Sequence, residues 1–264
     1  MAKTADLVTT LSVILRGICD EKGVIIDELE PDTISWKGIK EKFEETLTPA
    51  RFNACAAVLH LSKQCELSAT LCNNNLFLQS ICMVCLEIDN TIHTRCLEIL
   101  CNLTRLPSNN PILARNTYAV NALTEGCGRP HEKNDRTWSL RALQNISADI
   151  SSKEIISSSN ILKLLGKSAL RGGEEQEAAI ASMLNLSTDS VAIVRLMNSK
   201  QIVKTLLQLA HSSNVSADIR IMSCDTLATM ALRIQSYASA GLEPAGNVVT
   251  PLPTPLNTGW LRWN

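Results

Sequence analysis

Three segments that share one pattern decide the fold: EILCNLT at 98–104, RALQNIS at 141–147 and ASMLNLS at 181–187. Each ends in an asparagine, an aliphatic residue and a serine or threonine. AAVLHLS at 56–62 has the same pattern with histidine in place of the asparagine, and DTLATMA at 225–231 has threonine there. The sequence therefore contains an internal repeat, and a repeat has to be identified before any fold is assigned.

The repeat has a period close to 42 residues. Successive aligned positions are 43, 42, 43, 40 and 44 residues apart. The aligned residues are Gly17, a loose match, followed by His60, Asn102, Asn145, Asn185 and Thr229. Between two of these positions the chain contains a short helical pattern, such as SVAIVRLMN at 190–198, and then a second, such as QIVKTLLQLAHSS at 201–213. Each repeat is thus predicted to contain three helices.

Apolar residues flank the asparagine two positions before it and one position after it. These two positions are three residues apart and share a helix face, so they are predicted to form the stripe that packs against the other two helices. The asparagine lies off this stripe, on a face that it shares with the residues four and seven positions before it. That second face is the candidate functional surface.

This pattern resembles the armadillo repeat family from about residue 5 to residue 238. The resemblance implies an all-α fold, a right-handed α-solenoid of about five to six repeats. We expect the solenoid over 1–238, with an atypical N-terminal cap at 1–20 and an acidic first-repeat segment at 20–48, where nine acids face four lysines. The proline-rich segment 239–264 has no helical period and is predicted to be disordered.

The composition of the chain excludes several classes of function. A chain of 264 residues with 45% hydrophobic residues and a net charge of −1 folds, and it lacks the general positive charge that attracts nucleic acids or anionic membranes. Ten cysteines without a signal-peptide pattern indicate a reducing compartment, the cytoplasm or the cytoplasm and nucleus. Cys82 and Cys85 have the spacing of a zinc pair but fall on an apolar stripe, which favours buried core thiols. No catalytic residues, cofactor, metal or small-molecule substrate are predicted.

The resemblance implies that the asparagine face lines a concave groove that holds an extended peptide of a partner protein by its backbone. A carboxamide suits this role because it offers a donor and an acceptor together. On this interpretation an asparagine in an open groove contributes little to folding, and Trp138 is either a core residue or an anchor for the peptide. The predicted groove residues are Asn102, Asn145, Asn185, His60, Thr229, Arg95, Glu98, Trp138, Arg141 and Asp225.

Two other functions remain open at this point. A regulatory subunit or exchange-type factor would engage a folded enzyme through loops and the acidic segment. A nuclear-import adaptor is a more distant alternative, because the family members with that role carry a tryptophan one turn before the asparagine. Here those positions hold Ala56, Glu98, Arg141, Ala181 and Asp225. The three asparagines also match the N-glycosylation acceptor pattern, but the repeat position explains them better than a secretory route does.

Overall fold

The computed structural model describes residues 7–12, 14, 36–86 and 92–239. Within these ranges the regular structure is entirely helical and contains no strand, which confirms the predicted all-α fold. The predicted tail from residue 240 onward, most of the N-terminal cap and the acidic residues 20–35 lie outside the described residues.

The helices follow one another with short connections. They are α2 (Trp36–Ser62), α3 (Cys65–Cys72), α4 (Asn75–Leu86), α5 (His93–Thr104), η2 (Pro107–Asn109), α6 (Asn110–Arg115), α7 (Thr117–Gly128), α8 (Lys133–Ser147), η3 (Ile150–Ser152), α9 (Lys153–Ile156), α10 (Ser159–Ser168), α11 (Gly173–Ser187), α12 (Ser190–Asn198), α13 (Lys200–His211) and α14 (Ala217–Ser239).

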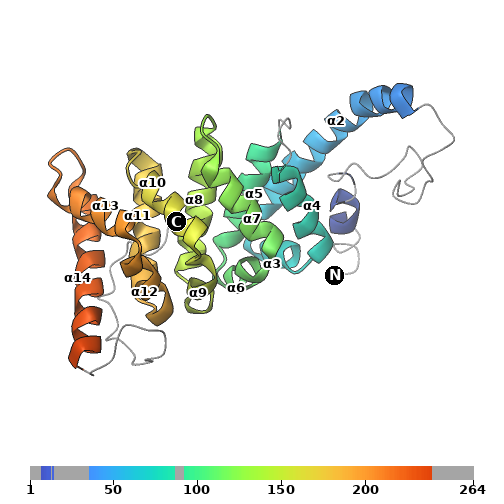
Figure 1. Ribbon diagram of the computed structural model, residues 1–264. Helices are drawn as coiled ribbons and strands as arrows, with labels where there is room; N and C mark the ends of the chain where they lie inside the picture. The colour runs from blue at the N-terminus through green and yellow to red at the C-terminus, as the bar shows by residue number, and fades with distance from the viewer. Residues whose placement is uncertain (1–6, 13, 15–35, 87–91, 240–264) are drawn as a thin grey trace.

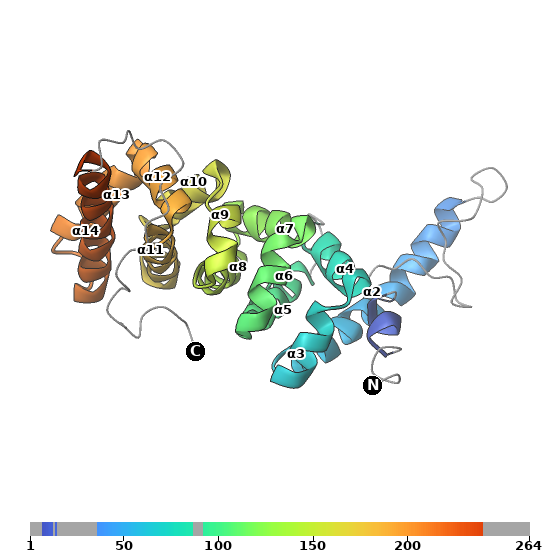
Figure 2. The same ribbon diagram turned by 90° about the horizontal axis from the view of Figure 1, so that it is seen from below.

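Four complete three-helix units stack along the molecule: α3–α5, α6–α8, α9–α11 and α12–α14 (Figure 1). Helix α2 precedes them as the third helix of a fifth unit, in line with the predicted number of repeats. The third helices α2, α5, α8, α11 and α14 pack in sequence against one another. In Figure 2, α5, α8 and α11 lie along one side of the array, and α7, α10, α12 and α13 lie along the other. We call these the third-helix face and the second-helix face.

The core runs the whole length of the stack. The two apolar positions that flank each asparagine are fully buried in the central units, as with Leu100 and Leu103 in α5 or Met183 and Leu186 in α11. In the outer third helices the stripe is less complete, because Leu61 and Leu227 are only partly buried. The predicted stripe is therefore confirmed, and burial is deepest where a unit has neighbours on both sides.

Side-chain caps start several helices where the chain turns. The Asp189 carboxylate accepts hydrogen bonds from the backbone N–H groups of Val191 and Ala192 at the start of α12. The Asn116 side chain accepts one from Ala119 at the start of α7. Each cap satisfies backbone donors that the first helical turn leaves unpaired.

Among the described residues no single helix is long and apolar enough to cross a membrane. Helices α3 and α4 together reach the required length and apolar content, but they meet at an angle of 88°. Their apolar side chains, such as Phe77 and Leu78, are buried in the core.

Gly126 marks a close approach of three helices. A Cβ atom at this position would lie 2.1 Å from Ser139 Oγ in α8 and 3.0 Å from Leu97 Cδ1 in α5. The absence of a side chain therefore lets α7 pack directly against both third helices.

We expect Gly126→Ala to lower the free energy of unfolding by about 1–2 kcal/mol, because Leu97 and Ser139 must move to admit the methyl group. Gly166→Ala is the matched control, since its Cβ would meet nothing closer than Ile202 Cγ1 at 3.6 Å. That variant should be neutral or stabilising by up to about 1 kcal/mol, because alanine is the better helix former. Urea unfolding measures both, and equal behaviour of the two variants would contradict the packing argument.

Candidate functional site

The three repeat asparagines are buried. Asn102, Asn145 and Asn185 are 7%, 4% and 1% exposed. The expectation that these side chains face open solvent is therefore wrong, and the reason for expecting them to contribute little to folding falls with it. Each carboxamide is enclosed between its own third helix and the third helix of the preceding unit.

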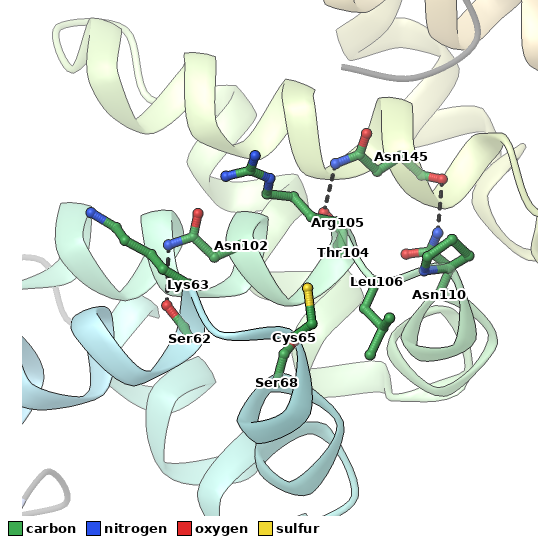
Figure 3. Close-up of a pocket in the computed structure, with 11 residues that line it drawn as sticks. Ser62, Lys63, Cys65, Ser68, Asn102, Thr104, Arg105, Leu106, Asn110 and Asn145 are labelled. Atoms are coloured by element: carbon green, nitrogen blue, oxygen red, sulfur yellow. Dashed lines mark hydrogen bonds between the residues drawn. The ribbon is translucent and has the colours of Figure 1, made fainter. Parts of the chain in front are cut away.

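Each asparagine donates a hydrogen bond from Nδ2 to a hydroxyl of the preceding unit. The bonds join Asn102 to Ser62 Oγ (3.1 Å), Asn145 to Thr104 Oγ1 (3.0 Å) and Asn185 to Ser147 Oγ (3.0 Å). Each acceptor lies two residues after the aligned position of its own unit, so it is the serine or threonine of the repeated pattern. We call this set of bonds the asparagine–hydroxyl ladder, and Figure 3 shows its bonds at Asn102 and Asn145.

The hydroxyls use their own protons within their own helices. The donors and carbonyl acceptors are Ser62 to Leu59 (2.9 Å), Thr104 to Cys101 (2.6 Å), Ser147 to Gln144 (2.6 Å) and Ser187 to Leu184 (2.7 Å). A hydroxyl whose proton is already bonded can only accept from outside the helix. The orientation of each asparagine amide is thereby fixed, with its N–H group toward the hydroxyl and its oxygen away from it.

The carboxamide oxygens of Asn102 and Asn145 point the same way, away from their ladder bonds (Figure 3). In the described part of the chain, Oδ1 of Asn185 is a fully buried atom without a hydrogen-bond partner. The corresponding oxygens of Asn102 and Asn145 are not in that position. Both asparagines also line an open pocket, so their oxygens are candidate acceptors for a ligand. The asparagines therefore offer mainly their carboxamide oxygens to a ligand in the groove. The ladder bonds use most of the amide N–H donors that the sequence predicts for peptide binding.

A pocket of about 270 Å³ lies beside these two asparagines, where the third helices α2 and α5 end and the next units begin. Two cations line it, Lys63 and Arg105. Its far wall is fixed by Asn110, whose Nδ2 donates to the carbonyl oxygen of Asn145 at 3.0 Å. The exposed thiol of Cys65 also faces the pocket.

Cations and aromatic rings pair across the third-helix face. The Arg95 guanidinium lies 3.9 Å from the ring centroid of Phe52 in α2, and the Arg141 guanidinium lies 5.3 Å from the ring of Trp138 in α8. Such cation–π pairs hold both side chains in place, and the aromatic ring remains as a flat apolar surface. Trp138 is partly buried against the core, so it is both a core residue and a wall of this face.

Two ion pairs cross between units on the same face. Lys63 Nζ lies 3.7 Å from Glu98 Oε1, and Arg141 Nη2 lies 2.7 Å from Glu174 Oε2. The predicted residues Arg95, Glu98, Trp138 and Arg141 therefore lie together on α5 and α8. Phe52, Lys63 and Glu174 belong to the same surface and were missed, because each contacts a residue of the neighbouring unit.

His60 and Thr229 do not extend the ladder as asparagines would. His60 is exposed at the first end. Thr229 Oγ1 donates to the Asp225 carbonyl oxygen within α14 at 2.8 Å, and Asp225 itself is exposed. The buried hydroxyl of Ser187 receives no asparagine from α14, so the ladder ends there.

The cysteines are mostly core residues. Cys82 and Cys85 are buried in α4, as the apolar stripe predicts, and burial raises the pKa of Cys82 to about 12. A raised pKa keeps the thiol protonated and unreactive. Across the residues that the structure describes, no group of three His, Cys, Asp or Glu side chains is arranged to hold a metal ion.

Comparison with known proteins gives matches in structure and none in sequence. No protein-family model matches the chain, and no curated protein does so at a significant level. A solved engineered protein is similar with a TM-score of 0.63 at 14% identity, covering 89% of this chain and 85% of its own.

Two designed armadillo repeat proteins are similar as well. One, solved in complex with the peptide (KR)4, has a TM-score of 0.62 at 11% identity and covers 88% of this chain and 89% of its own. The other, computationally designed for modular peptide recognition, has a TM-score of 0.60 at 15% identity and covers 86% and 90%. These likenesses show that the chain has an armadillo-type repeat fold.

Proposed function

We propose that this armadillo-type solenoid is a non-catalytic scaffold whose third-helix face binds an extended segment of another protein. The observation that carries the proposal is the pair of outward carboxamide oxygens of Asn102 and Asn145, which can accept hydrogen bonds from the backbone N–H groups of a bound chain. Backbone recognition of this kind requires an extended partner with free amide groups.

The flanking side chains supply the rest of a peptide site. The paired surfaces of Phe52 with Arg95 and of Trp138 with Arg141 offer flat contacts for partner side chains on both sides of the ladder. Aromatic and arginine residues provide much of the binding energy in protein interfaces. The designed neighbours, described as a complex with (KR)4 and as made for peptide recognition, support peptide binding on this fold.

The charges on this surface do not favour a basic partner. Around Asn102 and Asn145, Lys63, Arg95, Arg105 and Arg141 stand against Glu98 and Glu174, a balance of four cations to two anions, and the exposed Asp225 lies farther along on α14. A segment as basic as (KR)4 would be repelled by this excess. We therefore propose a neutral or acidic partner segment for the third-helix face.

Peptides selected from a random twelve-residue display library on the wild-type protein test the site. Phe52→Ala combined with Trp138→Leu should weaken the selected peptides by about tenfold or more, since both rings are lost from the surface. Tyr118→Ala is the matched control, because Tyr118 is an exposed ring on α7 away from the asparagines. It should change affinity less than about twofold. Peptides that bind the double variant as tightly as the wild type, with unchanged melting, would overturn the proposal.

A further inference from the structure

A groove of about 1040 Å³ separates α10 from α12 and α13, away from the asparagine ladder. The helices around it, α10, α12 and α13, belong to the second-helix face (Figure 2). The residues that line it include Ser157, Leu162, Lys163, Lys167, Leu170 and Arg195. The third-helix face and its proposed peptide site are not involved.

The helices around this groove are strongly basic. Helices α10, α12 and α13 carry Lys163, Lys167, Arg195, Lys200 and Lys204, and none of the three contains an aspartate or a glutamate. The chain as a whole has a net charge of −1. Positive charge is therefore concentrated on this part of the surface and raises the local concentration of anionic partners.

Lys163 and Lys167 lie one turn apart on α10, and both are exposed. No acidic side chain of the described ranges lies within 4.0 Å of either ammonium group. Like charges four residues apart destabilise a helix unless a partner neutralises them. Helix α10 can be aligned with α7 of the preceding unit through their buried residues, Ile161 with Ala119 and Leu165 with Leu123. In this alignment the positions of the two lysines hold Asn121 and Glu125 in α7, so the lysine pair is not a general feature of the repeat.

Arg195 is held at the opposite wall. Its Nη1 donates to the carbonyl oxygen of Glu154 at 2.6 Å and to Ser157 Oγ at 2.9 Å. Its Nη2 forms a weak surface ion pair with the largely exposed Glu154 carboxylate, at a distance of 3.7 Å. The guanidinium is thus fixed in place, and a carboxylate from outside can displace the Glu154 side chain.

The groove also offers apolar surface. Leu162 is buried at its base, and Leu170 is 46% exposed at its edge. No aromatic side chain lines it, so it lacks the stacking surface with which proteins bind single-stranded nucleic acid. We propose that this groove docks an acidic segment of a partner protein, whose carboxylates pair with Lys163, Lys167 and Arg195 while an aliphatic side chain covers the exposed Leu170.

Fluorescence anisotropy with the labelled peptide (EEL)4 tests the proposal. Lys163→Glu combined with Lys167→Glu should reduce its affinity by about tenfold or more, because two contacts become repulsive. Arg115→Glu combined with Lys133→Glu is the matched control. It makes the same change in charge at two exposed positions on α6 and α8 that do not line the groove, and it should cost less than about threefold. Leu170→Gln should weaken binding without altering the net charge.

Four outcomes would overturn this assignment. Equal losses from the two double variants would mean that the peptide responds to general positive charge. Equal binding of (QQL)4 would exclude carboxylate recognition, and tighter binding of the oligonucleotide dT20 would indicate a nucleic-acid surface. Phe52→Ala with Trp138→Leu should leave (EEL)4 binding intact. If that variant alone removes binding, the peptide occupies the third-helix face and the groove has no docking role.

Discussion

Replacing Arg136 by methionine should lower the free energy of unfolding by about 3–5 kcal/mol. Arg136 lies in α8, and its Nε and Nη2 donate to the two carboxylate oxygens of Glu175 in α11, both at 3.0 Å. The Glu175 side chain is almost fully buried. Without Arg136, the one cation among the described residues that remains paired with the Glu175 carboxylate is Arg171, whose Nη1 is 3.3 Å away.

The same arginine also holds the connection between α7 and α8. Its Nη1 donates to the carbonyl oxygens of Arg129 and Pro130, both at 2.8 Å. These carbonyls would lose their donor in the variant, which adds to the cost of the stranded carboxylate.

The double variant Arg136→Met with Glu175→Leu separates the two contributions. A buried ion pair replaced on both sides by apolar residues is often close to neutral, so most of the lost stability should return. The part that does not return measures the two connection carbonyls. Urea unfolding of the wild type, the single and the double variant gives all three values. A single variant as stable as the wild type would show that Glu175 is solvated in the native protein.

The sequence predicted the three-helix unit because the signals for it are local. The apolar spacing around Asn102, Asn145 and Asn185 lies within one helix, and a helix face can be deduced from its own residues. The repeat then indicated that the same unit recurs, and stacking of such units buries a continuous core. The resemblance to the armadillo family added the arrangement of the units.

The polar contacts between units could not be predicted in the same way. The ladder bonds join residues 38 to 41 positions apart, and their existence depends on how deeply one third helix packs against the next. Arg136 and Glu175 appear as ordinary exposed charges in a sequence, yet they are paired in the interior. The pattern of an asparagine followed two residues later by serine or threonine contained the signal for these bonds, because it recurs in the three central units that end in α5, α8 and α11.

The ladder gives the last prediction. Replacing Asn102, Asn145 and Asn185 together by alanine should lower the free energy of unfolding by about 3 kcal/mol or slightly more, since each replacement removes a buried ladder bond worth about 1 kcal/mol and Asn185 also loses a longer bond to the Gln144 carbonyl oxygen at 3.3 Å. Each also leaves a hydroxyl of the preceding unit without its donor. The loss falls on the interfaces between neighbouring units, which hold a solenoid together.

The control exchanges three exposed asparagines, Asn121, Asn134 and Asn160, for alanine. Alanine is the better helix former, so that variant should be as stable as the wild type or slightly more stable. Thermal and urea unfolding of both triple variants compare the same chemical change in buried and exposed positions. If the ladder variant unfolds like its control, the hydrogen bonds between units contribute nothing, and the asparagines are free to serve binding alone. If it unfolds early, as we expect, the repeated asparagines hold the units in register through Nδ2 and present to a ligand only the oxygens of Asn102 and Asn145.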